Sequence, residues 1–190
     1  MELWIHGLTF GSTANGPGRR HVVHTQGCSL GCPGCFNPTS HTAETGERLD
    51  TTELAHRLLD DPCDGVTISG GEPFQQPHAL YALITALRAH SPDLSILVFS
   101  GYSIEELRAQ TEAPKILRLI DVLVDGRFQV KEMAEGGLRG SANQRVHLLS
   151  TRHTPDELAD RSTEILIRPD GTIVMTGFPS GKLVGAIKRG

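Results

Sequence analysis

Three cysteines within eight residues form the group of side chains best suited to chemistry. Cys28, Cys32 and Cys35 are separated by three residues and then by two. Thiolates are soft ligands that favour iron and sulfide. Three thiolates can bind three irons of a 4Fe-4S cluster, which leaves the fourth iron to accept a chelating amino acid. We therefore expect these cysteines to bind a 4Fe-4S cluster with one open iron.

A structural zinc site is the alternative interpretation of the same cysteines. Zinc takes four nitrogen or sulfur ligands, so the site would have to recruit Cys63, His24 or His41 as well. Cys63 stands just before a predicted strand, where a lone cysteine is most often a small buried apolar residue. We assign no function to Cys63, and one leftover cysteine cannot bind a second cluster.

Length, charge and composition restrict the class of protein around these cysteines. The chain has 190 residues, which suit one domain, and a net charge of −4 with scattered Lys and Arg. No apolar run approaches the roughly 20 residues of a membrane span, and the N-terminus lacks the pattern of a secretory signal. We expect a cytoplasmic protein that binds neither nucleic acid nor membrane, in which cysteines serve as metal ligands instead of disulfides.

Short β-branched runs alternate with helix-patterned segments and must position the cysteines. Leucines and isoleucines recur at helical spacing after Pro77, and Ser103 and Thr154 each begin a capping-box pattern, so three helices are expected at these points. Alternating strands and helices predict an α/β domain with a mostly parallel sheet. The expected buried parallel strands are residues 21–25, 66–69, 95–99 and 121–125.

The loops that carry unusual residues follow these four strands in turn. Cys28 follows the first strand, Gly70-Gly71-Glu72 the second, Gly101-Tyr102 the third and Gly126-Arg127 the fourth. The carboxyl ends of parallel strands share one edge of a sheet, so we expect these loops to converge. Glycines let a ligand approach the backbone, and a carboxylate attracts an ammonium group. The structural alternative is a tight turn with Glu72 at the start of a helix.

Two later segments complete the predicted organisation. Residues 126–145 are rich in glycine and lack periodicity, which predicts a long loop that orders when a ligand or partner binds. Residues 164–168 and 172–176 flank Pro169-Asp170-Gly171, whose Asp-Gly pair favours a β-hairpin. We expect a single domain over residues 1–190, in which residues 151–190 form a C-terminal extension with a helix and this hairpin.

Taken together, the motifs resemble the radical S-adenosylmethionine superfamily and, within it, the activating proteins of the anaerobic ribonucleoside-triphosphate reductase. Gly34 precedes the third cysteine, where the wider superfamily often has an aromatic residue and the activating proteins also have glycine. The matching segments run in family order: Asn15-Gly16-Pro17-Gly18, Gln26-Gly27-Cys28, Cys32-Pro33-Gly34-Cys35, Asn37-Pro38, Ser69-Gly70-Gly71-Glu72-Pro73, Gly101-Tyr102, Asp121-Val122-Leu123-Val124-Asp125-Gly126-Arg127-Phe128 and Arg139-Gly140-Ser141-Ala142-Asn143-Gln144-Arg145.

The resemblance implies a partial (β/α) barrel of about six mostly parallel strands, radical S-adenosylmethionine type, with a C-terminal β-hairpin. It implies S-adenosyl-L-methionine as a second cofactor, cleaved reductively to a 5′-deoxyadenosyl radical. That radical would take a hydrogen atom from a glycine of the anaerobic ribonucleotide reductase, and a flavodoxin-like protein would donate the electron. The implied cofactor-binding residues are Gly34, Phe36, Gly70, Gly71 and Glu72, with Asp125 and Asn143 holding the ribose or shaping the substrate cleft.

Two other functions remain open at this point. One is a radical enzyme that acts on a small nucleotide-like or peptide substrate, with the long loop and the C-terminal hairpin as its lid. The other is a non-catalytic zinc or iron–sulfur module. Formation of 5′-deoxyadenosine separates this last class from both radical enzymes.

Overall fold

A seven-stranded sheet is the framework of the protein, in the order β3-β1-β2-β4-β5-β6-β7. The computed structural model describes residues 1–134, 136–159, 162–167, 170–171 and 173–179. β2, β4, β5 and β6 are parallel neighbours at the centre, whereas β1 and β7 run antiparallel to the strands beside them. The strands are β1 (Glu2–Ser12), β2 (Arg20–Thr25), β3 (Glu47–Asp50), β4 (Gly65–Gly70), β5 (Ser95–Ser100), β6 (Val122–Asp125) and β7 (Arg145–Leu148).

The four strands expected from the sequence correspond to β2, β4, β5 and β6, so the mixed α/β class with a mostly parallel sheet is confirmed. The sheet has seven strands instead of about six, because β1, β3 and β7 extend both sides. β1 pairs with β2 through two register shifts, between Ile5 and Gly7 and between Thr9 and Ser12. Such bulges break the alternation of apolar and polar residues by which a strand is recognised in a sequence.

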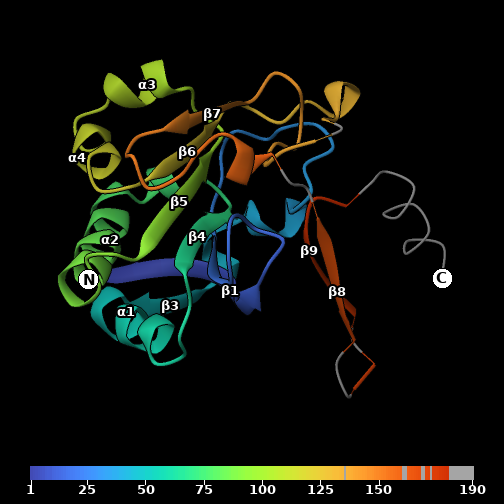
Figure 1. Ribbon diagram of the computed structural model, residues 1–190. Coiled ribbons are helices and arrows are strands. Elements are labelled where there is room, and N and C mark those ends of the chain that lie inside the picture. Colours follow the sequence, from blue (N-terminus) through green and yellow to red (C-terminus); the bar gives the residue numbers. More distant parts are fainter. Residues whose placement is uncertain (135, 160–161, 168–169, 172, 180–190) are drawn as a thin grey trace.

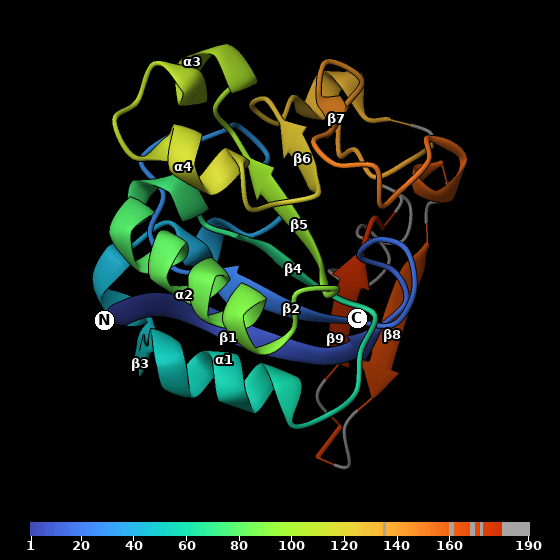
Figure 2. The same ribbon diagram turned by 60° about the vertical axis from the view of Figure 1, so that its left-hand side comes forward.

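Helices cover one face of the sheet, as Figures 1 and 2 show. They are α1 (Thr51–Leu59), α2 (Pro77–His90), α3 (Ile104–Arg108) and α4 (Ala113–Leu117). α2 begins at Pro77, as expected, and the capping box at Ser103 is formed in full at the start of α3. The main core lies between this layer and the sheet, and its fully buried side chains include Leu54, Leu58, Ile68, Leu80, Leu83, Ile84, Leu87 and Ile96.

The opposite face of the sheet has a smaller apolar cluster. Leu97, Val122 and Val124 of the sheet pack there against Leu138, from the loop between β6 and β7, and against Leu158. We call residues 126–144 the β6–β7 loop. The expected long loop is therefore present, and it packs across the face of the sheet that the helices leave uncovered.

The C-terminal extension contains the expected hairpin, in which β8 (Thr163–Ile167) pairs antiparallel with β9 (Ile173–Gly177). Its base is bound to the turn after β1: Glu164 accepts hydrogen bonds from Ser12 Oγ (2.6 Å) and Thr13 N (2.8 Å). Asn15 also donates to Thr176 Oγ1 at 2.7 Å. The hairpin projects beyond the seven-stranded sheet (Figure 1). Arg168, Pro169 and Thr172 of the predicted hairpin lie outside the described residues.

The prediction of a helix after Thr154 is wrong, because the structure has only a single 3₁₀ turn there, Asp156–Leu158. Half of the capping box forms, since Glu157 accepts a hydrogen bond from Thr154 N at 2.8 Å. Among the described residues, the reciprocal hydrogen bond from Glu157 N to the Thr154 hydroxyl is not formed, so the capping box is incomplete. No helix in the described part of the chain is long and apolar enough to cross a membrane.

Candidate metal centre

The cysteine loop, residues 26–37, leaves the carboxyl end of β2 and is held at its base by one buried glutamine. Gln26 Nε2 donates to the carbonyl oxygens of Thr39 and Thr42 and lies 2.9 Å from Thr45 Oγ1. Its Oε1 lies 2.8 Å from Nδ1 of His6. Gln26 therefore holds residues 39–45, which follow the cysteine loop, beside the residue at which the loop begins. The two ends of the loop are thus held together.

The three thiols of the loop are unpaired and half-buried. Burial raises the pKa of Cys28, and a hydrogen bond from the backbone amide of Leu30 partly opposes this rise. Burial likewise raises the pKa of Cys35, opposed by the amide of Asn37. Amide hydrogen bonds to sulfur are among the interactions by which proteins tune iron–sulfur clusters. The loop thus already supplies amide donors to two of the three cysteine sulfurs.

The arrangement of the thiols suits a cluster better than a single ion. Among the described residues, no three His, Cys, Asp or Glu side chains converge on one point that would hold a metal ion. A structural zinc needs four ligands around a single atom. In a 4Fe-4S cluster each cysteine binds a different iron, so the sulfurs do not have to converge. The donor set of three half-buried thiols with amide donors fits such a cluster.

Gly70-Gly71-Glu72 lies directly against the start of the cysteine loop. Gly71 N donates to Thr25 O (2.7 Å) and Glu72 N to Gly27 O (2.8 Å), which extends the pairing of β2 and β4 beyond the strands. A Cβ atom on Gly71 would lie 2.4 Å from Gly27 O, and Gly70 has φ +99°. Only glycine permits this approach of the two chains. The expected convergence of the loops after the first two strands is observed.

The carboxylate of Glu72 is enclosed by the protein and is only 1% exposed. Its Oε1 accepts hydrogen bonds from Phe74 N (3.0 Å) and Ser100 Oγ (2.9 Å), and Oε2 accepts from Gly101 N (2.7 Å). Burial raises the pKa of Glu72 to about 7, although these three donors lower it. Glu72 caps the 3₁₀ turn Pro73–Gln75, which is the structural alternative considered from the sequence. Binding of a cofactor ammonium stays a prediction.

Gly34 and Phe36 face the β6–β7 loop. A Cβ atom on Gly34, whose φ is +74°, would lie 2.9 Å from Cβ of Val130. The ring of Phe36 packs on that of Phe128 with 4.7 Å between their centroids. These two contacts join the cysteine loop to the β6–β7 loop. Neither residue is enclosed in a cavity, and their predicted contacts with adenine stay a prediction.

Asp125 and Asn143 lie at the carboxyl end of β6, but their hydrogen bonding differs. Asp125 is buried and accepts hydrogen bonds from Ile104 N (2.6 Å) and Arg145 Nη2 (2.9 Å). Asn143 Nδ2 donates to Arg127 O at 2.9 Å, whereas its Oδ1 is buried without a hydrogen-bond partner among the described residues. The Oδ1 atom of Asn143 can therefore accept a hydrogen bond from a ligand, whereas the carboxylate of Asp125 already accepts hydrogen bonds from the protein.

One residue of this edge escaped the sequence prediction. Gln75 receives a hydrogen bond from Ser29 N (3.0 Å) and donates to Ser29 Oγ (2.7 Å) and Tyr102 OH (3.1 Å). Arg127 stands over the ring of Tyr102, 5.5 Å from its centroid, and pairs with Glu106 at 2.9 Å. Nothing in the sequence distinguishes Gln75 from other turn residues, because its partners are distant in the chain.

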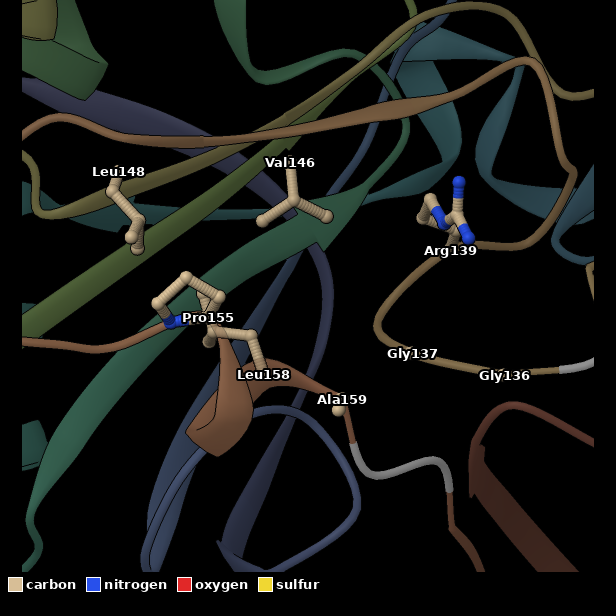
Figure 3. A pocket seen from close by; sticks show the side chains of 8 residues that line it. All are labelled: Gly136, Gly137, Arg139, Val146, Leu148, Pro155, Leu158 and Ala159. Carbon is tan, nitrogen blue, oxygen red and sulfur yellow. The ribbon is translucent and has the colours of Figure 1, made fainter.

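A cavity of about 440 Å³ lies elsewhere, between β7 and the segment that follows it. Figure 3 shows Val146 and Leu148 of β7 on one side of it and Pro155 and Leu158 on the other. None of the predicted site residues lines this cavity. It belongs to the face that the β6–β7 loop covers and not to the cysteine loop.

Comparisons with known proteins agree with the cysteine motif. Residues 14–147 match the family model of the 4Fe-4S single cluster domain. The anaerobic ribonucleoside-triphosphate reductase-activating protein of Vibrio cholerae is 36% identical over 143 residues, which cover 70% of this chain and 90% of that protein. The protein of the same name from Escherichia coli K12 is 34% identical over 145 residues, covering 71% of this chain and 92% of the relative.

More distant similarities extend beyond these bacterial relatives. The activating protein of Enterobacteria phage T4 is 33% identical over 137 residues, 70% of this chain and 85% of that protein. The crystal structure of QueE from Escherichia coli aligns with a TM-score of 0.48 and 15% identity, over 69% of this chain and 74% of that one. A structural likeness of that size supports no conclusion about function.

Proposed function

Because this chain belongs to the family of anaerobic ribonucleoside-triphosphate reductase-activating proteins, we propose that it is a radical S-adenosylmethionine enzyme that activates such a reductase. The observation that carries the proposal is the loop of three half-buried thiols held against Gly70-Gly71 at the carboxyl edge of the sheet. When bound, the cluster supplies one electron that splits S-adenosylmethionine into methionine and a 5′-deoxyadenosyl radical, which takes a hydrogen atom from a glycine of the reductase.

The chain's own residues bind and orient the two cofactors. Cys28, Cys32 and Cys35 would hold the cluster, which would bind S-adenosylmethionine for reductive cleavage. The backbone of Gly70-Gly71 borders the methionine part. Glu72 holds this border in shape through its three hydrogen bonds, and its buried charge favours an ammonium group nearby.

The remaining cofactor contacts follow from the residues around the cysteine loop. Gly34 and Phe36 lie beside the third cysteine and would border the adenine. The unpaired Oδ1 of Asn143 suits a hydroxyl donor such as that of a ribose, because a buried acceptor gains a partner when one binds. Asp125 orients Arg145 at the edge of the same site.

The proposal extends to the shape and setting of the protein. We propose a single domain whose sheet curves as a partial barrel and whose open side admits a glycine loop of the reductase. A flavodoxin-like protein would supply the electron. The setting is the cytoplasm, without nucleic acid or membrane as a partner.

Anaerobic reconstitution with iron and sulfide, followed by dithionite and S-adenosylmethionine, tests the reaction. The wild-type protein should form 5′-deoxyadenosine, Cys32→Ala should form none, and Cys63→Ala should match the wild type. Absence of 5′-deoxyadenosine from the wild type would refute the proposal and favour a non-catalytic metal module.

Electron paramagnetic resonance with the reductase encoded in the same organism tests the partner. A glycyl radical should appear only when both proteins, S-adenosylmethionine and reductant are present. Formation of 5′-deoxyadenosine with no glycyl radical would instead support a radical enzyme acting on a small nucleotide-like or peptide substrate.

A further inference from the structure

Gln75 joins three strand ends at the cysteine edge of the sheet. It follows β4, and its side-chain amide forms two hydrogen bonds with Ser29, the residue after Cys28: one with the backbone N–H at 3.0 Å and one with Oγ at 2.7 Å. The same amide donates to the hydroxyl of Tyr102, after β5, at 3.1 Å. Two hydrogen bonds to Ser29 fix the orientation of that residue as well as its distance from Gln75, because a single hydrogen bond would let Ser29 rotate about it.

Gln75 is itself held in a turn that is fixed by hydrogen bonds of Glu72. It ends the 3₁₀ turn Pro73–Gln75, which is capped by the buried carboxylate of Glu72. That carboxylate also binds Ser100 Oγ and Gly101 N at the end of β5. Gln75 therefore transmits the position of the β4 and β5 ends to the cysteine loop, and it does so at the residue next to a cluster ligand.

Little else in the described structure holds this part of the loop. Ser29 is exposed, and the amides of the preceding residues are bonded only at the base, Gly27 N to Ser40 O and Cys28 N to His41 O. The side chain of Leu30 lies close to Gly101, since a Cβ atom added to Gly101 would lie 2.4 Å from Cδ1 of Leu30. Besides these contacts and the hydrogen bond from the Leu30 amide to the Cys28 sulfur, Gln75 forms the only side-chain hydrogen bonds to Ser29 among the described residues.

We propose that Gln75 is a positioning residue that fixes the direction in which the cysteine loop presents Cys28 to the cluster. This inference rests on the proposed function in one respect, namely that the cluster bound by Cys28 is the one that binds S-adenosylmethionine. Gln75 is only partly buried and Ser29 is exposed, so loss of their hydrogen bonds should change the geometry of the loop more than the stability of the fold.

Three variants separate the hydrogen bonds from the size of the side chain. Gln75→Met keeps the length and removes every polar atom. Gln75→Glu keeps an acceptor for Ser29 N, and both hydroxyls can turn to donate to it. Gln110→Met is the matched control, because Gln110 lies two residues after the end of α3 and, among the described residues, forms a hydrogen bond only through its backbone.

The first measurement uses the metal-free protein and follows amide hydrogen exchange by NMR. Gln75→Met should speed exchange of the Ser29 amide by about 10-fold, as expected for the loss of one hydrogen bond. The Cys28 amide, which donates to His41 O, should keep its rate. Equal Ser29 exchange in Gln75→Met and the wild type would overturn the proposal.

The second measurement uses the reconstituted protein and records the electron paramagnetic resonance spectrum of the reduced cluster and the Kd for S-adenosylmethionine. Gln75→Met should bind the normal amount of iron, show a changed spectrum and bind the cofactor about 10-fold more weakly, while Gln75→Glu recovers both properties. An unchanged spectrum in Gln75→Met would overturn the proposal. If the wild-type cluster binds no S-adenosylmethionine, the proposed function fails, and the spectrum without cofactor decides the role of Gln75.

Discussion

Replacing Gly71 by alanine should force apart the two loops that form the metal centre. The added Cβ would lie 2.4 Å from the carbonyl oxygen of Gly27 and 3.0 Å from its carbonyl carbon. Both atoms belong to the backbone, so no side chain can rotate to relieve the contact. The β2 and β4 ends must separate, and the hydrogen bonds from Gly71 N to Thr25 O and from Glu72 N to Gly27 O stretch with them.

The expected cost is the sum of these two effects. Overpacking of this kind costs about 1–3 kcal/mol, and the two weakened backbone hydrogen bonds together add about 1 kcal/mol. We therefore expect Gly71→Ala to lower the free energy of unfolding by about 2–4 kcal/mol. Gly7→Ala is the matched control, because a Cβ on Gly7 meets no atom within 4 Å. The control should change the free energy of unfolding by less than about 0.5 kcal/mol.

Urea unfolding of the metal-free proteins, followed by circular dichroism, measures both variants. Gly71→Ala should unfold at a lower urea concentration with an unchanged slope, and it should also retain less iron after reconstitution. Equal midpoints for Gly71→Ala and Gly7→Ala would refute the reasoning. That result would mean that the loops separate freely and that the close approach does not hold the metal centre together.

Three further outcomes follow from the same structure. Burial raises the pKa of Glu72 from 4.5 to about 7, so its stabilising contribution is complete below pH 4.5 and is lost as the pH rises through 7. Urea unfolding between pH 4 and 8 should show that the free energy of unfolding of the wild type falls by about 3 kcal/mol relative to that of Glu72→Gln. Arg20→Met should lower the melting temperature, because the variant loses the buried hydrogen bonds that Arg20 donates to Val66 O and Ser95 O. Cys63→Ser should bind as much iron as the wild type, measured by iron and sulfide analysis.

The centre of the fold could be predicted from the sequence because of how its strands are buried. β2, β4, β5 and β6 are almost entirely buried, so each appears in the sequence as a short run rich in β-branched residues. The other strands lack this signal. β3 is polar and partly exposed at one edge, β7 is exposed at the other, and β1 carries two bulges. The helix after Thr154 failed because a local motif predicts only a start, whereas the tertiary course of the chain decides its length.

The sequence predicts which residues belong to the candidate site, but it predicts only some of the contacts between them. Cysteine spacing predicts the metal ligands, and the order of the strands brings the loops to one edge. The partners of Glu72, namely Ser100 and Gly101, follow a different strand, and no local pattern indicates them. Gln75 was missed for the same reason. Its importance lies in three distant hydrogen bonds that exist only once the sheet has formed.

The attachment of the C-terminal hairpin has a consequence for the order in which the protein is assembled. Glu164 binds Ser12 and Thr13, about 150 residues earlier in the chain, at the turn that precedes β2. The cysteine loop leaves the opposite end of β2, about 20 Å away along a six-residue strand. During synthesis, the loops of the cysteine edge can therefore meet once the β6–β7 loop has been made, whereas the opposite end of the sheet gains its contact with the hairpin only after Glu164.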